Sequence, residues 1–460
     1  MAWQTANSIG LGTTMKTSLP FSAGRASSVR WRILAILVAM SFISYVLRTN
    51  LSFAAPEMMA DLGLNEIQWG YVLAAFTAGY TIFQFPGGLL GDRFGPRRVL
   101  TAIAALWAVM TAVTSLVPAQ GVSSVAVILV ALMAVRFVVG ATHAPIFPVV
   151  NASVVRWFPP GSWALPLGLT STGLTLGGAT GAIVVPLLIT QYGWRTAFLV
   201  IAPLGLITAG LWWWYARDNP RDHPAVSEAE AALILDGRDE TELDSLDQSP
   251  ESDAGPAPWL QVLKNRDVML LTLSYAFMNF VFYFVFNWFF FYLVEVRGFS
   301  ATDAGFVASA QWIAGAIGAT VGGWLCDRMC RRLGMRWGVR WPIAIGMGIS
   351  IVLLLVGALH PNAAVAVAAM VLLFFFNQLC EGPYWAASVA IGGRHAGAAG
   401  GVLNTGANAM GIINGLLVPW LALGFGWSVA IASAAVFTLI GIGLMLLVRA
   451  DCPIDREAPA

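Results

Sequence analysis

"GGLLGDRFG", residues 87–95, decides the fold because the chain carries a second version of it, "GGWLCDRMC", at residues 322–330. The two aspartates, Asp92 and Asp327, are 235 residues apart. Two further pairs repeat at an offset of 233 residues, namely "STGLTLGGATGAIVVP" with "NTGANAMGIINGLLVP" and "YGWRTAF" with "FGWSVAI". Three matches, in order and at nearly one offset, predict a duplicated structural unit.

The composition places both copies in a membrane. Of 460 residues, 58% are hydrophobic and only 11% are charged, against about a quarter charged in soluble proteins. Windows of about 20 mainly apolar residues predict transmembrane helices. There are six before and six after a polar stretch: residues 31–55, 68–91, 97–118, 123–150, 164–190 and 196–216, then 268–294, 303–326, 340–359, 364–390, 397–422 and 427–449. We therefore expect an all-α membrane protein with twelve transmembrane helices in two six-helix bundles.

The orientation follows from the basic residues. With an even number of spans both termini share one side, and 21 of the 25 Lys and Arg residues fall there. Cytoplasmic loops carry the excess of Lys and Arg, so both termini are expected in the cytoplasm of a bacterial inner-membrane protein. The stretch "SEAEAALIL", residues 227–235, predicts one short helix with a capping-box start inside an otherwise flexible acidic linker. The predicted organisation is a cytoplasmic tail (1–30), a six-helix bundle (31–216), the linker (217–264), a second bundle (265–450) and a tail (451–460).

Several classes are not supported by the residues present. The net charge is +1, so no overall field attracts nucleic acid. The four cysteines have no metal-ligand spacing and no paired histidines, and no nucleophile–base set or phosphate loop is visible. We expect no metal, no cofactor and no enzymatic activity, and a monomer whose partners are the lipid bilayer and a small solute.

Two charged side chains inside the predicted spans point to that solute. Arg48 and Arg136 are the only basic residues expected within spans, and each costs at least roughly 2.5 kcal/mol at that depth. A guanidinium does not deprotonate and matches the geometry of a carboxylate. A structural ion pair is the alternative, but the spans of the first half carry no acid to complete it. The pair therefore favours binding of an anion.

The loop after the second span resembles the signature of the major facilitator superfamily, Gly-x-Leu-x-Asp-Arg-x-Gly-x-Arg. It is carried by Gly88, Leu90, Asp92, Arg93, Gly95 and Arg97, and partly repeated by Gly323, Leu325, Asp327 and Arg328. Asp92 could meet the positive end of the eleventh span and Arg156, closing and opening a gate. The alternative is that these arginines only anchor the loops. The predicted gating residues are Asp92, Arg93, Arg97, Arg156, Asp327 and Arg328.

Within that superfamily the chain resembles the anion:cation symporter family of organic-anion permeases. The resemblance is carried by "SYVLRTNLSFAAPEM", "RFVVGATHAPIFP", "VVRWFPPGS", "HPAVSEAE" and "FNWFFFYLVEVRGFS". It implies uptake of small carboxylate-bearing solutes by alternating access, with a site near the midplane between the halves. By the same resemblance, Arg48 and Arg136 hold the carboxylate, and Tyr45, Tyr80 and Asn404 are polar groups around it.

The chain departs from that family at two acids. Leu47 stands where the family has an acid before the arginine, and His143 stands where it has a glutamate. His143 follows Arg136 by two helical turns, so both face one way, and it could carry a proton or remain a neutral hydrogen-bonded histidine. Glu381, the only carboxylate deep within a predicted span, is either a relocated proton carrier or a buried counter-ion.

These observations predict a secondary active transporter that imports a small carboxylate, such as a sugar acid, an aromatic acid or a short dicarboxylate, coupled to protons. An uncoupled facilitator or anion exchanger is the alternative within transport. A membrane-bound sensor or partner protein that does not transport is the alternative from another class.

Overall fold

The computed structural model of the chain describes residues 27–159, 164–235, 259–392 and 396–454, and these residues are almost entirely helical. The first half begins with the long helix α1, whose C-cap Gly63 adopts a left-handed conformation. Its helices are α1 (Val29–Leu62), α2 (Glu66–Phe94), α3 (Pro96–Ser115), α4 (Val125–His143), α5 (Ile146–Trp157), α6 (Ala164–Ile201) and α7 (Pro203–Tyr215).

The second half has the same kind of elements. A short connecting region holds η1 (Pro220–Asp222), α8 (Glu228–Leu235) and α10 (Trp259–Lys264). The helices that follow are α11 (Arg266–Phe291), η2 (Tyr292–Val296), α12 (Ala301–Leu359), α13 (Ala363–Leu379), α14 (Glu381–Gly392), α15 (Ala396–Phe425) and α16 (Trp427–Leu447).

Nine helical segments of the described chain are long and apolar enough to cross a membrane. Two of these segments each hold two spans, because the chain reverses direction at a glycine. Gly193 in α6 and Gly334 in α12 take φ angles of 75° and 77°, which only glycine adopts readily. The 29-residue α2 is also long enough to cross. The described residues therefore contain twelve spans, and the expected all-α architecture is confirmed.

Two spans are broken near their middle. α4 ends at His143 and α5 begins two residues after Ala144, because Pro145 cannot continue the hydrogen bonding of α4. α13 ends at Leu379, and α14 starts with Glu381. The predicted spans 123–150 and 364–390 are thus each two helices.

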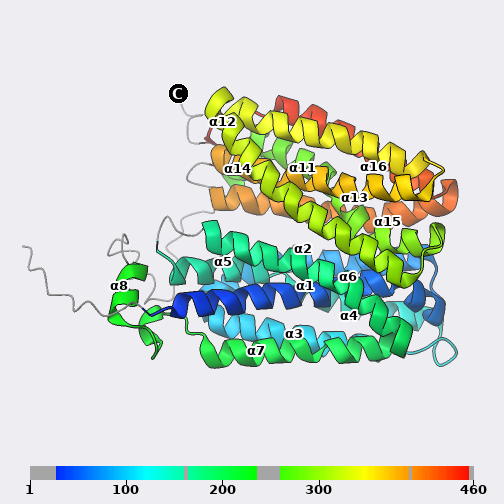
Figure 1. Ribbon diagram of the computed structural model, residues 1–460, viewed down its shortest axis with the longest axis horizontal. Helices are drawn as coiled ribbons and strands as arrows, with labels where there is room; N and C mark the ends of the chain where they lie inside the picture. The colour runs from blue at the N-terminus through cyan, green and yellow to red at the C-terminus, as the bar shows by residue number, and fades with distance from the viewer. Residues whose placement is uncertain (1–26, 160–163, 236–258, 393–395, 455–460) are drawn as a thin grey trace, which may run out of the picture.

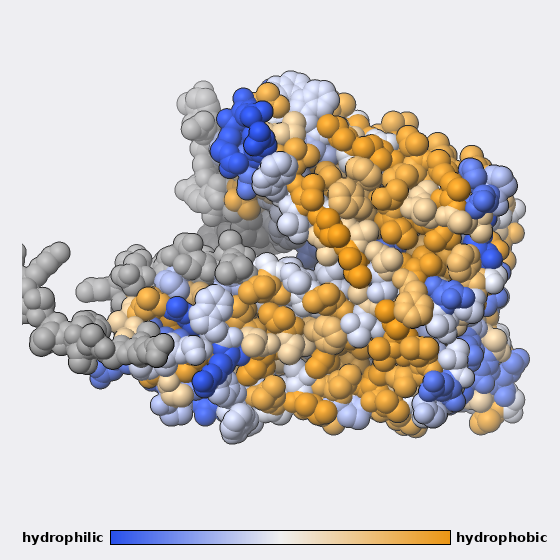
Figure 2. Space-filling view, viewed as in Figure 1, coloured by the Kyte–Doolittle hydropathy of each residue, from blue (hydrophilic) through white to orange (hydrophobic). Residues whose placement is uncertain are grey.

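The helices lie side by side in two groups, with α1–α7 below and α11–α16 above in Figure 1. The chain ends of the described part lie at the end where α8 sits, which we call the α8 end. The opposite end, which we call the far end, carries the connections at Gly63, Gly193 and Gly426. Figure 2 shows a broad apolar belt with hydrophilic residues gathered at both ends, as expected for a chain surrounded by lipid.

The two halves approach each other closely toward the far end. A Cβ atom on Gly70 of α2 would lie 2.1 Å from the carbonyl oxygen of Gly415 in α15. A Cβ atom on Gly305 of α12 would lie 2.3 Å from the carbonyl oxygen of Ala182 in α6. Figure 2 shows the surface hollowed between the halves on the side of the α8 end.

The short linker helix forms where expected and binds α1. Glu230 of α8 is fully buried, and its carboxylate accepts backbone N–H bonds from Val29 at 3.0 Å and Arg30 at 3.1 Å. The hydroxyl of Ser27 also donates to this carboxylate, and Ser27 Oγ accepts from the backbone of Ser227 at 2.8 Å. Glu230 therefore caps the positive N-terminus of α1, which has no side-chain cap of its own.

A histidine completes this junction. His223 is 6% exposed, its ring contacts Tyr215 at 4.9 Å and Trp157 at 5.8 Å, and its Nδ1 accepts the Ala225 N–H at 3.2 Å. Burial lowers the pKa of His223 below its usual range. The neutral ring thus holds residues 217–235 against the first half, while residues 236–258 of the predicted linker lie outside the described residues.

Candidate functional site

Arg48 lies in the middle of α1 and is only 5% exposed. Four aromatic rings surround its guanidinium, whose central carbon lies 4.6 Å from the ring centre of Tyr80 and 5.3 Å from those of Tyr45, Phe76 and Phe286. The ring of Tyr80 is the nearest of the four. Ring faces attract a cation, so this aromatic shell partly replaces the water that Arg48 has lost. Phe286 belongs to the second half, and the charge therefore lies where the halves meet.

Arg136 of α4 is the second charge at this place. It is 4% exposed, and its guanidinium carbon lies 4.8 Å from the ring centre of Phe76. Because Arg48 contacts the same ring, the two guanidinium carbons are no more than about 10 Å apart. The Nε atoms of both arginines are buried without a hydrogen-bond partner among the described residues, and no carboxylate of those residues forms a salt bridge with either arginine.

His143, seven residues after Arg136, lies beside the same ring. Its imidazole stacks on Trp107 at 4.8 Å and meets Phe76 edge-on at 6.1 Å. Its Nδ1 lies 2.9 Å from the Val139 carbonyl oxygen. A carbonyl only accepts, so Nδ1 carries the hydrogen of the neutral ring. Nε2 is buried without a partner among the residues described here, and this atom is where an additional proton would go.

The second half contributes polar groups next to Arg48. Tyr283 of α11 packs edge-on against Phe286, the ring that contacts Arg48, and its hydroxyl donates to Asn408 Oδ1 at 2.6 Å. Asn408 Nδ2 donates to Gln84 of α2 at 3.1 Å and to the Asn404 carbonyl oxygen at 2.8 Å. This chain of hydrogen bonds joins the two halves. The predicted site residue Asn404 contacts it only through Asn408.

Glu381 lies apart from the arginine cluster. Its Oε1 accepts from the Tyr275 hydroxyl at 2.6 Å and from Trp385 Nε1 at 2.9 Å. No salt bridge joins Glu381 to an arginine in the described residues. It stands at the break between α13 and α14, as His143 stands at the break between α4 and α5. The two candidate proton carriers thus occupy comparable positions in opposite halves.

The predicted gating residues lie at the α8 end. Arg97 donates to the Trp213 carbonyl oxygen at 2.7 Å from Nη2, and its backbone N–H donates to Asp218 at 2.7 Å, so it connects elements of the first half only. Arg156 is half-buried in the last turn of α5. The side chain of Asp92 lies outside the described set. The remaining three, Arg93, Asp327 and Arg328, are exposed.

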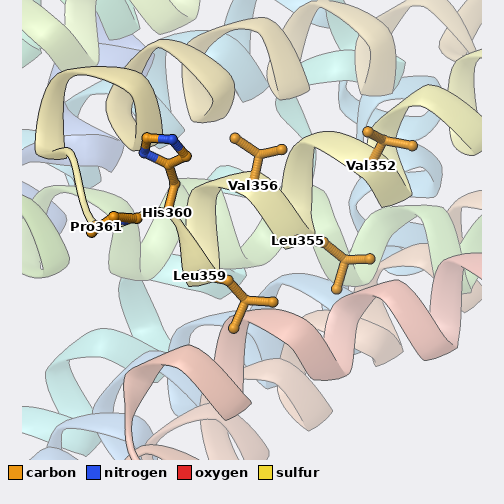
Figure 3. A pocket seen from close by; sticks show the side chains of 6 residues that line it. All are labelled: Val352, Leu355, Val356, Leu359, His360 and Pro361. Atoms are coloured by element: carbon orange, nitrogen blue, oxygen red, sulfur yellow. The ribbon is translucent and has the colours of Figure 1, made fainter.

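One groove in the described part of the chain lies away from the arginine pair and lacks the groups of a carboxylate site. This groove at the far end of α12 is lined mainly by apolar residues, and His360 is the only lining residue with a basic side chain (Figure 3). It is lined by Val352, Leu355, Val356, Leu359, His360 and Pro361. Among the residues that the structure describes, no group of three or more His, Cys, Asp or Glu side chains could hold a metal ion.

Four residues of the cluster were not predicted from sequence: Phe76, Gln84, Phe286 and Asn408. Phe76 and Asn408 each lie four residues from a predicted site residue, Tyr80 and Asn404, on the same helix face. This four-residue spacing could have pointed to Phe76 and Asn408 as further residues of the site. The expectation that only Arg48 and Arg136 are basic residues within spans is wrong. α12 also buries Arg340, which donates from Nε to the Val448 carbonyl oxygen at 3.0 Å and so caps the end of α16.

A twelve-span chain built of two repeated halves, with unpaired charges buried between them, defines the class of membrane transporters that work by alternating access. The family model of the Major Facilitator Superfamily matches residues 37–335. The chain belongs to this superfamily, and it is a transporter-family protein and not an enzyme.

Curated relatives support the resemblance to organic-anion permeases. The probable galactarate/D-glucarate transporter GudP of Bacillus subtilis is 30% identical over 404 residues, covering 87% of each chain. The probable sulfoacetate transporter SauU of Cupriavidus necator is 29% identical over 393 residues, covering 85% of this chain and 87% of the relative. The D-galactonate transporter of Escherichia coli is 28% identical over 439 residues, covering 94% and 98%.

Solved structures share the fold. A bacterial homologue of the human lysosomal transporter Spinster, in an inward-facing and unoccupied conformation, matches with a TM-score of 0.74 at 18% identity, covering 95% of this chain and 100% of that one. A D-xylose–proton symporter matches with a TM-score of 0.69 at 16% identity, covering 94% and 100%.

Proposed function

We propose that the protein is a secondary active transporter that imports a small organic anion. The observation that carries the proposal is the pair of buried arginines, Arg48 and Arg136, whose Nε atoms have no partner among the described residues. A buried charge needs a counter-charge, and a carboxylate in the cavity between the halves would supply it. The relatives named above as sugar-acid and sulfoacetate transporters act on anions of this kind.

The substrate class is a polyhydroxy acid. Its carboxylate binds between Arg48 and Arg136, and its hydroxyl groups meet Tyr45, Tyr80 and the amide chain of Asn404 and Asn408. Amides and phenols both donate and accept, so they suit the hydroxyls of a sugar acid better than the methylenes of a fatty acid.

Transport proceeds by rocking of the two halves around this site. In a bacterial inner membrane, both termini and hence the α8 end face the cytoplasm, because the Lys and Arg residues gather at that end. The tight contacts at the far end then correspond to an outer side that is closed. Asp92, Arg93, Arg97 and Arg156 in the first half, with Asp327 and Arg328 in the second, form the inner gate.

Coupling to protons uses His143 or Glu381. A carboxylate bound to the arginine pair would favour the protonated ring of His143, since a nearby opposite charge stabilises a cation. Glu381 would take its proton at the equivalent helix break of the second half. The protein works as a monomer.

The test of substrate binding is uptake of a labelled sugar acid into proteoliposomes, after a melting-shift screen against a panel of carboxylates. Arg48→Ala is expected to abolish uptake while the purified variant still melts cooperatively. Uptake by Arg48→Ala equal to that of the unchanged protein would overturn the proposal. Binding without uptake would instead favour a sensor.

Coupling is tested separately by imposing a pH gradient. Uptake should accelerate when the outside is acidic, and the double variant His143→Gln/Glu381→Gln should lose that acceleration. Two results together would indicate a facilitator or exchanger and not a proton-coupled transporter. The double variant would still show counterflow, and adding substrate to the unchanged protein would move no protons.

A further inference from the structure

Three sulfur atoms meet at the corner where α12 reverses direction at the α8 end. Cys326 and Cys330 lie one helical turn apart before Gly334, and Met335 is the first residue after it. The Cys330 Sγ atom lies 3.8 Å from Cys326 Sγ and 3.8 Å from Met335 Sδ. The Cys-x3-Cys spacing of this pair supplies only two sulfurs, and the glycine corner brings the third.

Each of these two separations matches one edge of a metal–sulfur polyhedron. With metal–sulfur bonds of about 2.3 Å, two ligands of a tetrahedral or trigonal site lie about 3.8–4.0 Å apart. The corner is also held tightly, because a Cβ atom on Gly338 would lie 2.5 Å from Cys330 Sγ. Cys330 is therefore already at the separation that a shared ion requires from both other sulfurs, and a bound ion would set the third separation, between Cys326 and Met335.

We propose that Cys326, Cys330 and Met335 bind a soft monovalent metal ion, Cu(I) or Ag(I). Thiolate and thioether ligands select Cu(I), whereas hard cations prefer oxygen. Each thiol releases its proton to solvent as it binds. Met335 is 37% exposed and Cys330 is half-buried, so the ion can reach the site from the aqueous side.

The position gives the site a consequence for transport. A bound ion would tie together the two arms of the corner beside Asp327 and Arg328, which belong to the repeated loop motif. A cross-link at this place would restrict any rearrangement of the loop between the eighth and ninth spans.

The experiment titrates the purified protein in detergent with Ag(I) against a competing chromophoric chelator. The unchanged protein is expected to bind one ion, and Cys330→Ser and Cys326→Ser are each expected to lose it. Met335→Leu should weaken the affinity by at least about tenfold, since even indirect ligand partners change affinity by that factor. The matched control is Cys380→Ser/Cys452→Ser, which removes the other two cysteines and should leave binding unchanged.

X-ray absorption of the Cu(I)-loaded protein should give sulfur neighbours at about 2.3 Å. The proposal fails if the unchanged protein binds no ion, or if binding survives in a folded Cys330→Ser variant. It also fails if binding is lost in the Cys380→Ser/Cys452→Ser control. Melting curves of each variant separate loss of the site from loss of the fold.

Discussion

A close approach between the halves makes Gly70 a position where one methyl group should shift the conformational equilibrium. The Cβ atom that Gly70→Ala adds would lie 2.1 Å from the Gly415 carbonyl oxygen. An ordinary contact needs at least 3.4 Å, so α2 and α15 must separate by more than about 1 Å wherever this crossing is closed. The clash exists only while the far end is closed and disappears when the halves part there.

The magnitude follows from the cost of overpacking. An extra methyl in a tight contact costs about 1–3 kcal/mol, which changes the ratio of two conformations about 5- to 150-fold. Gly70→Ala should therefore populate a state opened at the far end, slow uptake and leave the fold of each half intact.

Two spin labels would measure this shift. Tyr192 in the first half and Leu359 in the second are 60% and 66% exposed at the far end, and labels there in a cysteine-free background report the separation of the halves. Gly70→Ala should lengthen the distance between them.

Two matched variants complete the test. Gly210→Ala adds a methyl where no atom lies within 4 Å and should change nothing. Gly79→Ala meets the Phe137 carbonyl oxygen at 2.1 Å inside one half, so it should lower the melting temperature without lengthening the distance. If Gly70→Ala gives the same distances and uptake as Gly210→Ala, the inferred closure at the far end is wrong.

Three further predictions concern charges. Arg136→Lys keeps the positive charge but loses the bidentate hydrogen bonding of a guanidinium, so sugar-acid affinity measured by calorimetry should fall by about 10- to 150-fold. The control is Arg340→Lys, because Arg340 is equally buried but donates to the end of a helix, and this variant should bind the sugar acid normally. Equal losses of affinity in both variants would refute a direct role of Arg136 in binding. Glu230→Ala leaves the Val29 and Arg30 N–H groups unpaired and should cost about 1–3 kcal/mol for each of them. Glu230→Gln keeps one acceptor oxygen, while its NH2 group cannot accept the second bond, so it should cost about half as much. The melting temperature should fall more for Glu230→Ala than for Glu230→Gln, and equal falls would show that the bonds to α1 do not matter. Burial lowers the pKa of His223, so the folded protein binds fewer protons there than the unfolded chain, and stability should fall as the pH drops below about 6.5. His223→Asn can still accept the Ala225 N–H but does not titrate, so its melting temperature should depend less on pH between pH 5 and 8. An unchanged pH dependence would exclude His223 as the cause of the loss of stability at low pH.

The spans were predictable because each is a long apolar run, and the duplication was predictable because Asp92 and Asp327 recur in equivalent loops. The residues at which each span begins and ends were less predictable. The reversal at Gly334 occurs with hardly any interruption of the helix, so composition could not show where the eighth span ends. Arg340 is the first residue of the predicted span 340–359, and the sequence did not show that α12 buries its side chain.

The arginine pair was predictable as two charges, but not as one site. What brings them together is the crossing of α2 and α4, where Gly140 lies so close to Phe76 that a Cβ atom would be 1.9 Å from its carbonyl oxygen. That contact places the Phe76 ring against Arg48 and Arg136. A contact between two helices depends on their relative rotation, which one sequence does not contain.

The same cluster explains why an anion would couple binding to movement. Two guanidinium groups within about 10 Å repel each other by about 2 kcal/mol or more at an effective dielectric of about 20. Ring faces return about 0.5–2 kcal/mol each, less than the several kcal/mol that burying each ion costs. A carboxylate between them would remove the repulsion and supply the missing acceptors. Because Phe286 contacts Arg48 from the second half, the substrate would then be held by both halves at once, and its arrival would lower the energy of the conformation in which they close around it.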